Sequence, residues 1–151
     1  MRVATLILFA ACTLAAQNST RAGRFHVEHP TLLNLGFEWA IEGDANRNAT
    51  AEVRFRKAGT TSWLQALPLL RIGGERMYRE NYNMSYTVPD GFAGSILNLE
   101  PATSFECEFT LRDPDGVTGQ AQQRVTVSTR AEPKSYEGGR VLHVYPDDHQ
   151  G

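Results

Sequence analysis

The sequence predicts an all-β fold, an antiparallel β-sandwich of about seven strands. Three observations support this prediction. Apolar and polar residues alternate with a period of two along several segments, and short stretches rich in Gly, Asn, Asp and Pro separate these segments. No segment shows the 3.6-residue apolar period of an amphipathic helix. Short alternating strands joined by turns of this kind are typical of a sandwich.

The clearest strand signal lies near the start of the predicted domain. Its apolar members alternate with small or polar residues and are Leu33, Leu35, Phe37, Trp39 and Ile41. Successive side chains of a strand point to opposite faces, so these five share one face, which we expect to be buried. Phe37 and Trp39 are therefore predicted core residues.

The other strands follow in order, each bounded by turn-forming residues. They are expected at residues 25–28, 51–56, 63–70, 94–99, 104–112 and 120–130. Pro68 lacks a backbone N–H and places its segment at a sheet edge. Phe55 and Phe109 occupy apolar positions of their strands and join the predicted core. Together these strands define a sandwich at residues 24–130.

Two segments do not fit a minimal sandwich. One is the insertion at residues 71–92, between the fourth and fifth predicted strands. The other is the tail at residues 131–151, which starts with linker composition. Within it, residues 140–146 alternate as one further strand. A single strand cannot bury its faces, so we interpret the tail as a linker and the start of a downstream domain.

An apolar N-terminal stretch predicts a secretory signal. Arg2 provides a basic start, and the residues that follow it up to Ala16 carry no charge. We assign residues 1–16 to a signal peptide, with Ala22 as a second cleavage site, and expect a secreted, extracellular or periplasmic protein. Cys12 follows two alanines as in a lipoprotein signal, so lipid anchoring through Cys12 is the alternative.

The composition limits the classes of partner. The chain has 15 basic and 17 acidic residues, a net charge of −2, which produces no long-range field to attract nucleic acid or an anionic membrane. No apolar run reaches the roughly 18 residues that a membrane span requires. We therefore expect neither nucleic-acid binding nor membrane insertion of the mature form. Cys107 shares the apolar face of its strand and is predicted to be a buried thiol.

A short motif carries a family resemblance. Leu99, Pro101, Thr103 and Phe105 stand in a stretch that resembles the Leu-x-Pro-x-Thr-x-Tyr corner of fibronectin type III domains. The resemblance covers about residues 25–130 and implies an immunoglobulin-like sandwich topology. Phe105 occupies the position of the family's Tyr, so the hydroxyl that would bond the backbone at this corner is absent.

The same resemblance implies that the third and sixth strands are antiparallel neighbours. Arg54 and Arg56 face outward on the third strand, and Glu106 and Glu108 face outward on the sixth. Opposite charges across a ladder attract each other, whereas a one-residue slip would turn both arginines into the core. We therefore expect at least one Arg–Glu contact between these strands.

A narrower resemblance concerns five stretches of the chain. Residues 34–39, 42–44, 46–50, 69–75 and 142–146 are similar to the N-terminal module of secreted bacterial proteins that continue into a right-handed parallel β-helix, of polysaccharide-active type. This resemblance implies a downstream β-helix domain as the partner. It also implies that any catalytic residues lie beyond the end of this sequence.

One turn copies the start of a calcium-binding loop. Asp44, Asn46 and Asn48 match its first three ligands, but Ala49 and Phe55 stand where the loop requires Gly and Glu. We interpret the segment as a polar turn, because Asx side chains hydrogen-bond their own backbone. No zinc, phosphate-loop or Ser-His-Asp pattern occurs, so we expect no metal, no cofactor and no catalysis by this chain.

The insertion contains the aromatic-rich polar segment of the sequence. Tyr78, Tyr82 and Tyr86 are interspersed with Asn81 and Asn83. Aromatic faces flanked by amide groups suit the binding of sugars. The alternative interpretation is that the tyrosines pack against the sandwich edge or against the next domain.

The function predicted from these observations is that of a non-catalytic accessory module, which spaces or docks a following domain. One alternative is a carbohydrate-binding module that uses Tyr78, Tyr82 and Tyr86, with polysaccharide as the partner. The other is a fragment of a polysaccharide-degrading enzyme whose catalytic residues lie beyond Gly151.

Overall fold

The structure is a computed structural model that describes residues 18–135, 137–140 and 142–148. The predicted signal peptide and Cys12 lie outside these residues. The strands are β1 (Thr20–Val27), β2 (Leu35–Gly43), β3 (Thr50–Lys57), β4 (Leu64–Gln65), β5 (Leu70–Ile72), β6 (Arg76–Arg79), β7 (Met84–Thr87), β8 (Gly91–Ile96), β9 (Ser104–Arg112), β10 (Val117–Thr118) and β11 (Gln122–Ser128), with a 3-10 turn, η1 (Glu80–Tyr82), between β6 and β7. Apart from Asn18 at its start, the described part of the chain has no α-helical residue.

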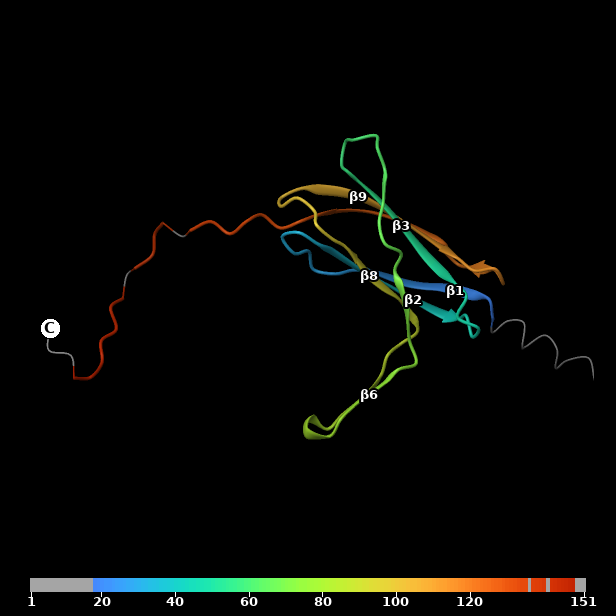
Figure 1. Cartoon of the computed structure of the whole chain (residues 1–151), viewed down its shortest axis with the longest axis horizontal. Coiled ribbons are helices and arrows are strands. Elements are labelled where there is room, and N and C mark those ends of the chain that lie inside the picture. Colours follow the sequence, from blue (N-terminus) through green and yellow to red (C-terminus); the bar gives the residue numbers. More distant parts are fainter. Residues whose placement is uncertain (1–17, 136, 141, 149–151) are drawn as a thin grey trace, which may run out of the picture.

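The strands form two packed sheets and one separate hairpin (Figure 1). Sheet A has the order β10-β1-β2-β8-β5, and sheet B has the order β11-β9-β3-β4. All pairs are antiparallel except β1 with β10. The predicted all-β sandwich is therefore confirmed, with more and shorter strands than the seven expected.

The core lies between the inner faces of the two sheets. Trp39 and Phe37 from sheet A and Phe109 from sheet B are almost completely buried, as predicted, and Phe55 is partly buried against them. The ring centroid of Phe37 lies 4.6 Å from that of Phe109, and Phe25 packs 5.5 Å from Trp39 at a right angle. Aromatic contacts of this geometry add to the gain from burial.

The predicted contact across β3 and β9 is confirmed. Arg54 pairs with Glu108 and Arg56 with Glu106 in the ladder. The Arg56 guanidinium approaches the Glu106 carboxylate to 2.6 Å, and Arg54 forms an ion pair with Glu108. This register leaves Phe109 and Cys107 inward, and Cys107 is fully buried.

The corner before β9 forms without the tyrosine hydroxyl. Phe105 packs in the core, and the Thr103 hydroxyl donates to the Pro101 carbonyl at 2.9 Å. Thr129, which follows β11, is buried; its hydroxyl donates to the Glu100 carbonyl at 2.6 Å and accepts from the Thr103 N–H at 3.0 Å. Thr129 thus supplies the side-chain bond to the corner backbone that Phe105 cannot make.

Four predicted strands differ from the structure. Two differ in their bounds, because β1 (Thr20–Val27) begins five residues before the predicted 25–28 and β8 (Gly91–Ile96) begins three residues before the predicted 94–99. The other two differ in kind. The strand expected at residues 63–70 is divided into β4, which pairs with β3, and β5, which pairs with β8. The chain therefore crosses from sheet B to sheet A near Pro68, which cannot donate a ladder hydrogen bond. The strand expected at residues 140–146 is not formed in the described residues, because no neighbouring strand pairs with it.

Candidate functional site

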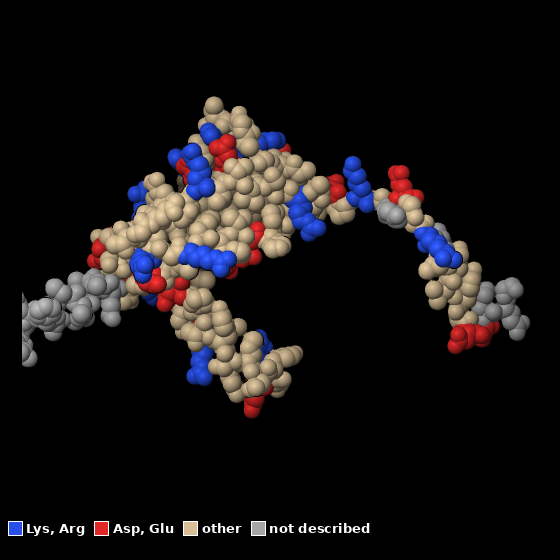
Figure 2. Space-filling model, turned by 180° about the vertical axis from the view of Figure 1, so that it is seen from behind, with Lys and Arg blue, Asp and Glu red and all other residues tan. Residues whose placement is uncertain are grey.

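The most distinctive feature outside the sandwich is a projecting hairpin, residues 76–87, which we call the arm. It consists of β6, η1 and β7 and stands away from both sheets (Figure 1). Every residue of the arm is exposed. Figure 2 shows the arm as a projection from the body of the sandwich, with Arg and Glu side chains among its mostly uncharged residues. The insertion that the sequence left without an assignment therefore forms a ribbon with no covering layer among the described residues.

The register of the arm separates the predicted tyrosines. Met77 pairs with Tyr86 and Tyr78 pairs with Ser85, so Tyr86 and Tyr78 point to opposite faces of the ribbon. Tyr82 lies in the 3-10 turn at the tip, where 81% of its surface is exposed. The structure therefore does not bring the three tyrosines together into one platform.

One face of the arm is mainly apolar. Arg79 pairs with Met84, so Met84 and Arg79 share the face of Met77 and Tyr86. Met77, Met84 and Tyr86 each expose between 42% and 52% of their surface. Unbranched Met side chains adapt to irregular partner surfaces, which makes this face suitable for contact with another macromolecule.

The apolar face of the arm continues into the outer face of sheet A. A hollow at the junction is lined by Ala40, Ile72, Tyr86, Val88 and Gly91, among others. Around it, β8 places Gly91, Ala93 and Ser95 opposite Ala40, Glu38 and Gly36 of β2, so this outer face consists of small side chains around the Glu38 carboxylate. Leu70 on the edge strand β5 is 71% exposed beside it. We call the apolar arm face and this part of sheet A together the elbow.

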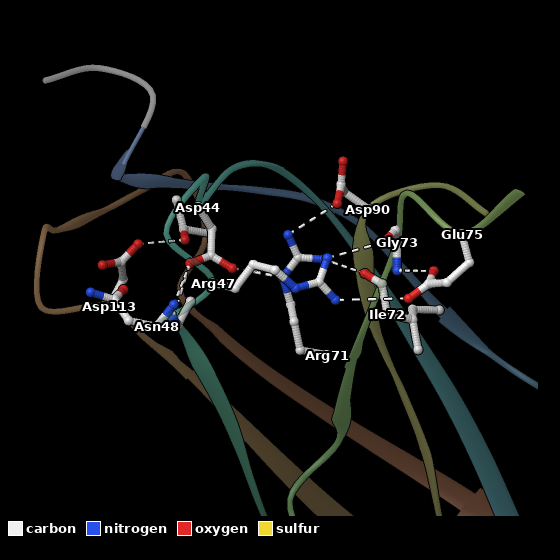
Figure 3. A network of polar contacts seen from close by, with 11 residues as sticks. Asp44, Arg47, Asn48, Arg71, Ile72, Gly73, Glu75, Asp90 and Asp113 are labelled. Carbon is white, nitrogen blue, oxygen red and sulfur yellow. Dashed lines mark hydrogen bonds and ion pairs between the residues drawn. The ribbon is translucent and has the colours of Figure 1, made fainter. Parts of the chain in front are cut away.

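A buried ion-pair network fixes the root of the arm (Figure 3). Asp44 is fully buried, and its Oδ2 accepts a hydrogen bond of 2.6 Å from Arg71 Nε. The Asp44 Oδ1 accepts the backbone N–H groups of Asn48 and Ala49. Arg71, whose side chain is only 12% exposed, also donates to Asp90 Oδ1 at 3.0 Å. The two strands that lead into and out of the arm are thus held against the β2–β3 turn.

A second set of contacts holds the residues that immediately precede the arm. The Glu75 carboxylate accepts the Gly73 N–H at 2.8 Å, and Arg47 donates to the Gly73 carbonyl at 3.0 Å (Figure 3). Backbone hydrogen bonds from Glu75 and Gly73, followed by the charge of Arg47, lower the pKa of Glu75. Gly73 has φ = +130°, and a Cβ there would lie 2.6 Å from the backbone Cα of Asp90, so this close approach requires glycine.

The turn that resembles a calcium loop has no free ligand oxygens at Asp44, because both carboxylate oxygens accept hydrogen bonds. The Asn46 and Asn48 amides instead donate to Asp115 Oδ2 at 2.7 and 3.0 Å, and these bonds lower the pKa of Asp115. Within the described ranges, no group of three or more His, Cys, Asp or Glu side chains is arranged to hold a metal ion. The segment is a structural turn that joins the β2–β3 and β9–β10 connections.

Sequence reasoning missed Arg71 and Trp63. Arg71 opens the predicted insertion, and its positive charge is complementary to the negative charge of Asp44 in the β2–β3 turn. The two residues are 27 positions apart, so the sequence alone does not pair them. Trp63 was predicted only as part of a strand. The structure places its indole over the guanidinium groups of Arg54 and Arg56, on the outer face of sheet B.

Comparisons with known proteins identify no family for this chain. No protein-family profile matches the chain, and no curated protein sequence matches it. Among solved structures, it is similar to a computationally redesigned β-sandwich protein with 16% identity, 74% coverage of this chain, 95% coverage of that chain and a TM-score of 0.38. In the described residues, no helix has the length and apolar character needed to cross a membrane.

Proposed function

We propose that this chain is a non-catalytic interaction module, similar to fibronectin type III domains, in which the elbow docks the domain that follows in the same polypeptide. The observation that carries this proposal is the arm. Its twelve residues are all exposed, and its Met77, Met84 and Tyr86 face water together. A two-stranded ribbon is marginally stable alone, so burial against a partner would stabilise it.

The root of the arm supports a docking role. The Asp44–Arg71–Asp90 contacts and the Gly73 approach fix where the ribbon leaves the sandwich. A fixed root reduces the conformational freedom that a partner must remove on binding. The arm is thus presented in advance to an incoming surface instead of being ordered at that moment.

The tail supports the choice of partner. Leu142, Val144 and Tyr145 are exposed in a segment whose alternation is that of a strand. A domain connected through residues 131–139 would reach the elbow at a high effective concentration, so a modest contact area would suffice. A following β-helix, as the sequence resemblance implies, would also supply the neighbour that residues 140–146 require to form a strand.

Export of the protein is part of the proposal, and the position of β1 bears on the cleavage site. β1 begins at Thr20, which is buried and donates to Asp113 Oδ2 at 2.5 Å. Cleavage after Ala22 would remove this bond and the pairing of residues 20–22 with β2. Cleavage near Ala16 keeps both, and we propose that site.

Glycan binding by the arm is a second candidate function. Tyr82 is the most exposed aromatic residue of the arm, and Asn81 and Asn83 flank it. An exposed ring between two amides can stack on one sugar unit. Because Tyr78 and Tyr86 point to opposite faces, this candidate rests on the tip alone.

The experiment that tests docking is hydrogen exchange measured on residues 76–87 in this chain and in the complete polypeptide that the gene encodes. We expect at least tenfold slower exchange in the complete polypeptide, because docking would exclude water from the ribbon. The double variant Met77→Ser/Tyr86→Ser should abolish this difference. The matched variant Tyr78→Ser, on the opposite face, should retain it.

Equal exchange rates of the arm in the two proteins would contradict docking. If the arm were instead a glycan-binding tip, its exchange would slow only when a polysaccharide is added, and Tyr82→Ala would remove that response.

A further inference from the structure

The outer face of sheet B carries a row of charged side chains that is not electrically balanced. Across the ladder, Arg54 on β3 and Arg124 on β11 both pair with Glu108 on β9. Both guanidinium groups form ion pairs with that one carboxylate. Elsewhere on this face each arginine has its own partner, as in Arg56–Glu106. The row therefore retains one net positive charge.

Among Arg54, Glu108 and Arg124, the exposed charges are the two cations. The side chains of Arg54 and Arg124 are 54% and 64% exposed, whereas that of Glu108 is 14% exposed. Guanidinium N–H groups not used by Glu108 can therefore bind an oxyanion from solution, and their planar fork suits two oxygens of a carboxylate or sulfate.

Trp63 holds these arginines in place. Its ring lies 4.8 Å from the Arg54 guanidinium carbon, 4.6 Å from that of Arg56 and 5.8 Å from that of Arg124. Cation–π contacts of this kind restrict otherwise flexible side chains. The arginines are consequently ordered before a ligand arrives, which lowers the entropic cost of binding.

A polar hollow lies beside the row. Arg54, Glu108 and Arg124 line it together with Thr110, Gln120 and Gln122. Hydroxyl and amide groups both donate and accept hydrogen bonds, which is the chemistry that sugar hydroxyl groups require. The hollow runs across β9 to β11, on the sheet opposite to the elbow, so it is independent of docking.

We propose that this hollow binds an acidic polysaccharide, with a uronate or sulfate group on the Arg54–Arg124 pair and neighbouring sugar hydroxyls on Thr110, Gln120 and Gln122. One excess positive charge beside neutral polar groups matches a polymer whose acidic groups are spaced apart along a chain of sugar hydroxyls. Nucleic acid presents a dense phosphate backbone, which would require many cations. The net charge of −2 also provides no long-range attraction, so recognition depends on these local contacts.

The test is titration calorimetry of the purified chain with polygalacturonate, dextran sulfate and neutral dextran in low salt. We expect binding to one or both acidic polymers and none to neutral dextran. Comparison of polygalacturonate with dextran sulfate distinguishes recognition of a carboxylate from recognition of a sulfate. Arg124→Gln should weaken binding about tenfold, since it removes the excess charge. Glu108→Gln should tighten binding, because it frees both arginines.

The control is Arg112→Gln. Arg112 is 63% exposed on the same strand as Glu108 and pairs with Glu52, but it does not line the hollow. It changes the net charge of the protein by the same amount as Arg124→Gln and should leave affinity unchanged. Equal losses in the two variants would show that only general charge matters, and absence of binding to both acidic polymers would overturn the proposal. Preferential binding of a nucleic acid or an acidic peptide would also overturn it.

Discussion

The sandwich and the arm differ in how much of their side-chain surface is buried. The sandwich buries a contiguous set of apolar side chains, including the fully buried Trp39, whereas the arm buries none of its residues. Both are built from antiparallel strands with ordinary ladder pairing. Pairing alone therefore does not distinguish them. The difference lies in whether a second layer covers the strands.

This difference indicates where the stability of the chain resides. Burial of apolar surface is the dominant favourable contribution to folding, so the free energy of unfolding should depend on the sandwich and very little on the arm. The network at the root of the arm lies between these extremes, because it is buried but polar. Substitutions in the three regions should consequently have effects of decreasing size.

The largest effect is expected in the core. Trp39→Ala removes a side chain with no exposed surface that packs against Phe25, and it should lower the free energy of unfolding by about 3–5 kcal/mol. Urea denaturation of the two proteins measures this difference. Trp39→Phe should cost less, because it keeps a ring and removes an indole N–H that has no hydrogen-bond partner in the structure. Wild-type stability of Trp39→Ala would show that the core is assigned wrongly.

The root network should give the next largest effect. Asp44→Asn leaves the Arg71 guanidinium without its buried carboxylate partner, while Asn tolerates the left-handed backbone at this position (φ 53°). We expect a loss of about 3 kcal/mol, together with faster hydrogen exchange at residues 73–75 and 88–90. Asp90→Asn is the matched control, because Asp90 is half exposed, and it should cost well under half as much. Equal costs would indicate that the burial of Asp44 is not what fixes the arm.

A smaller effect, dependent on pH, is expected at Cys107. Burial raises the pKa of this thiol from its ordinary 9.0 to about 12. The unfolded chain therefore loses the thiol proton before the folded chain does. The stabilisation is complete below the unfolded pKa and declines as the pH rises from there towards the folded value, by up to ~1.4 kcal/mol per pH unit. Urea midpoints measured between pH 8 and 10.5 should fall more steeply for the wild type than for Cys107→Ala. Rapid alkylation of Cys107 in the native protein would contradict its burial.

Much of the sandwich could be predicted from the sequence because its evidence is local. The alternation around Trp39 and the charges at Arg54 and Glu108 specify which face of each strand is buried, and the structure confirms both. The sequence also predicts the corner at Phe105. It does not predict that the Thr129 hydroxyl makes the side-chain hydrogen bonds to the corner backbone that Phe105 cannot make. Thr129 follows a different strand, and only the folded topology brings its hydroxyl to Glu100.

The arm and the hollow on sheet B could not be derived in the same way. No face of the arm packs on the core of this chain, so the spacing of its apolar residues does not reveal which of them share a face. The Arg54–Glu108–Arg124 row unites three strands, and its excess charge becomes visible only when the register is known. Tyr78 and Tyr86 illustrate the same limit, since their separation in sequence did not reveal that they occupy opposite faces.

The smallest effect on stability is expected in the arm itself. Met77→Ser/Tyr86→Ser changes two side chains that are about half exposed and that do not belong to the buried core, so the free energy of unfolding of this chain should change by less than about 0.5 kcal/mol. Urea denaturation checks the value, and light scattering at high concentration should show less self-association, because an exposed apolar face has been removed. A loss of 2 kcal/mol or more, on the scale of a core substitution, would mean that the arm is covered by other parts of this chain. In that case the arm would belong to the sandwich, and its exposed face would no longer be a reason to propose docking.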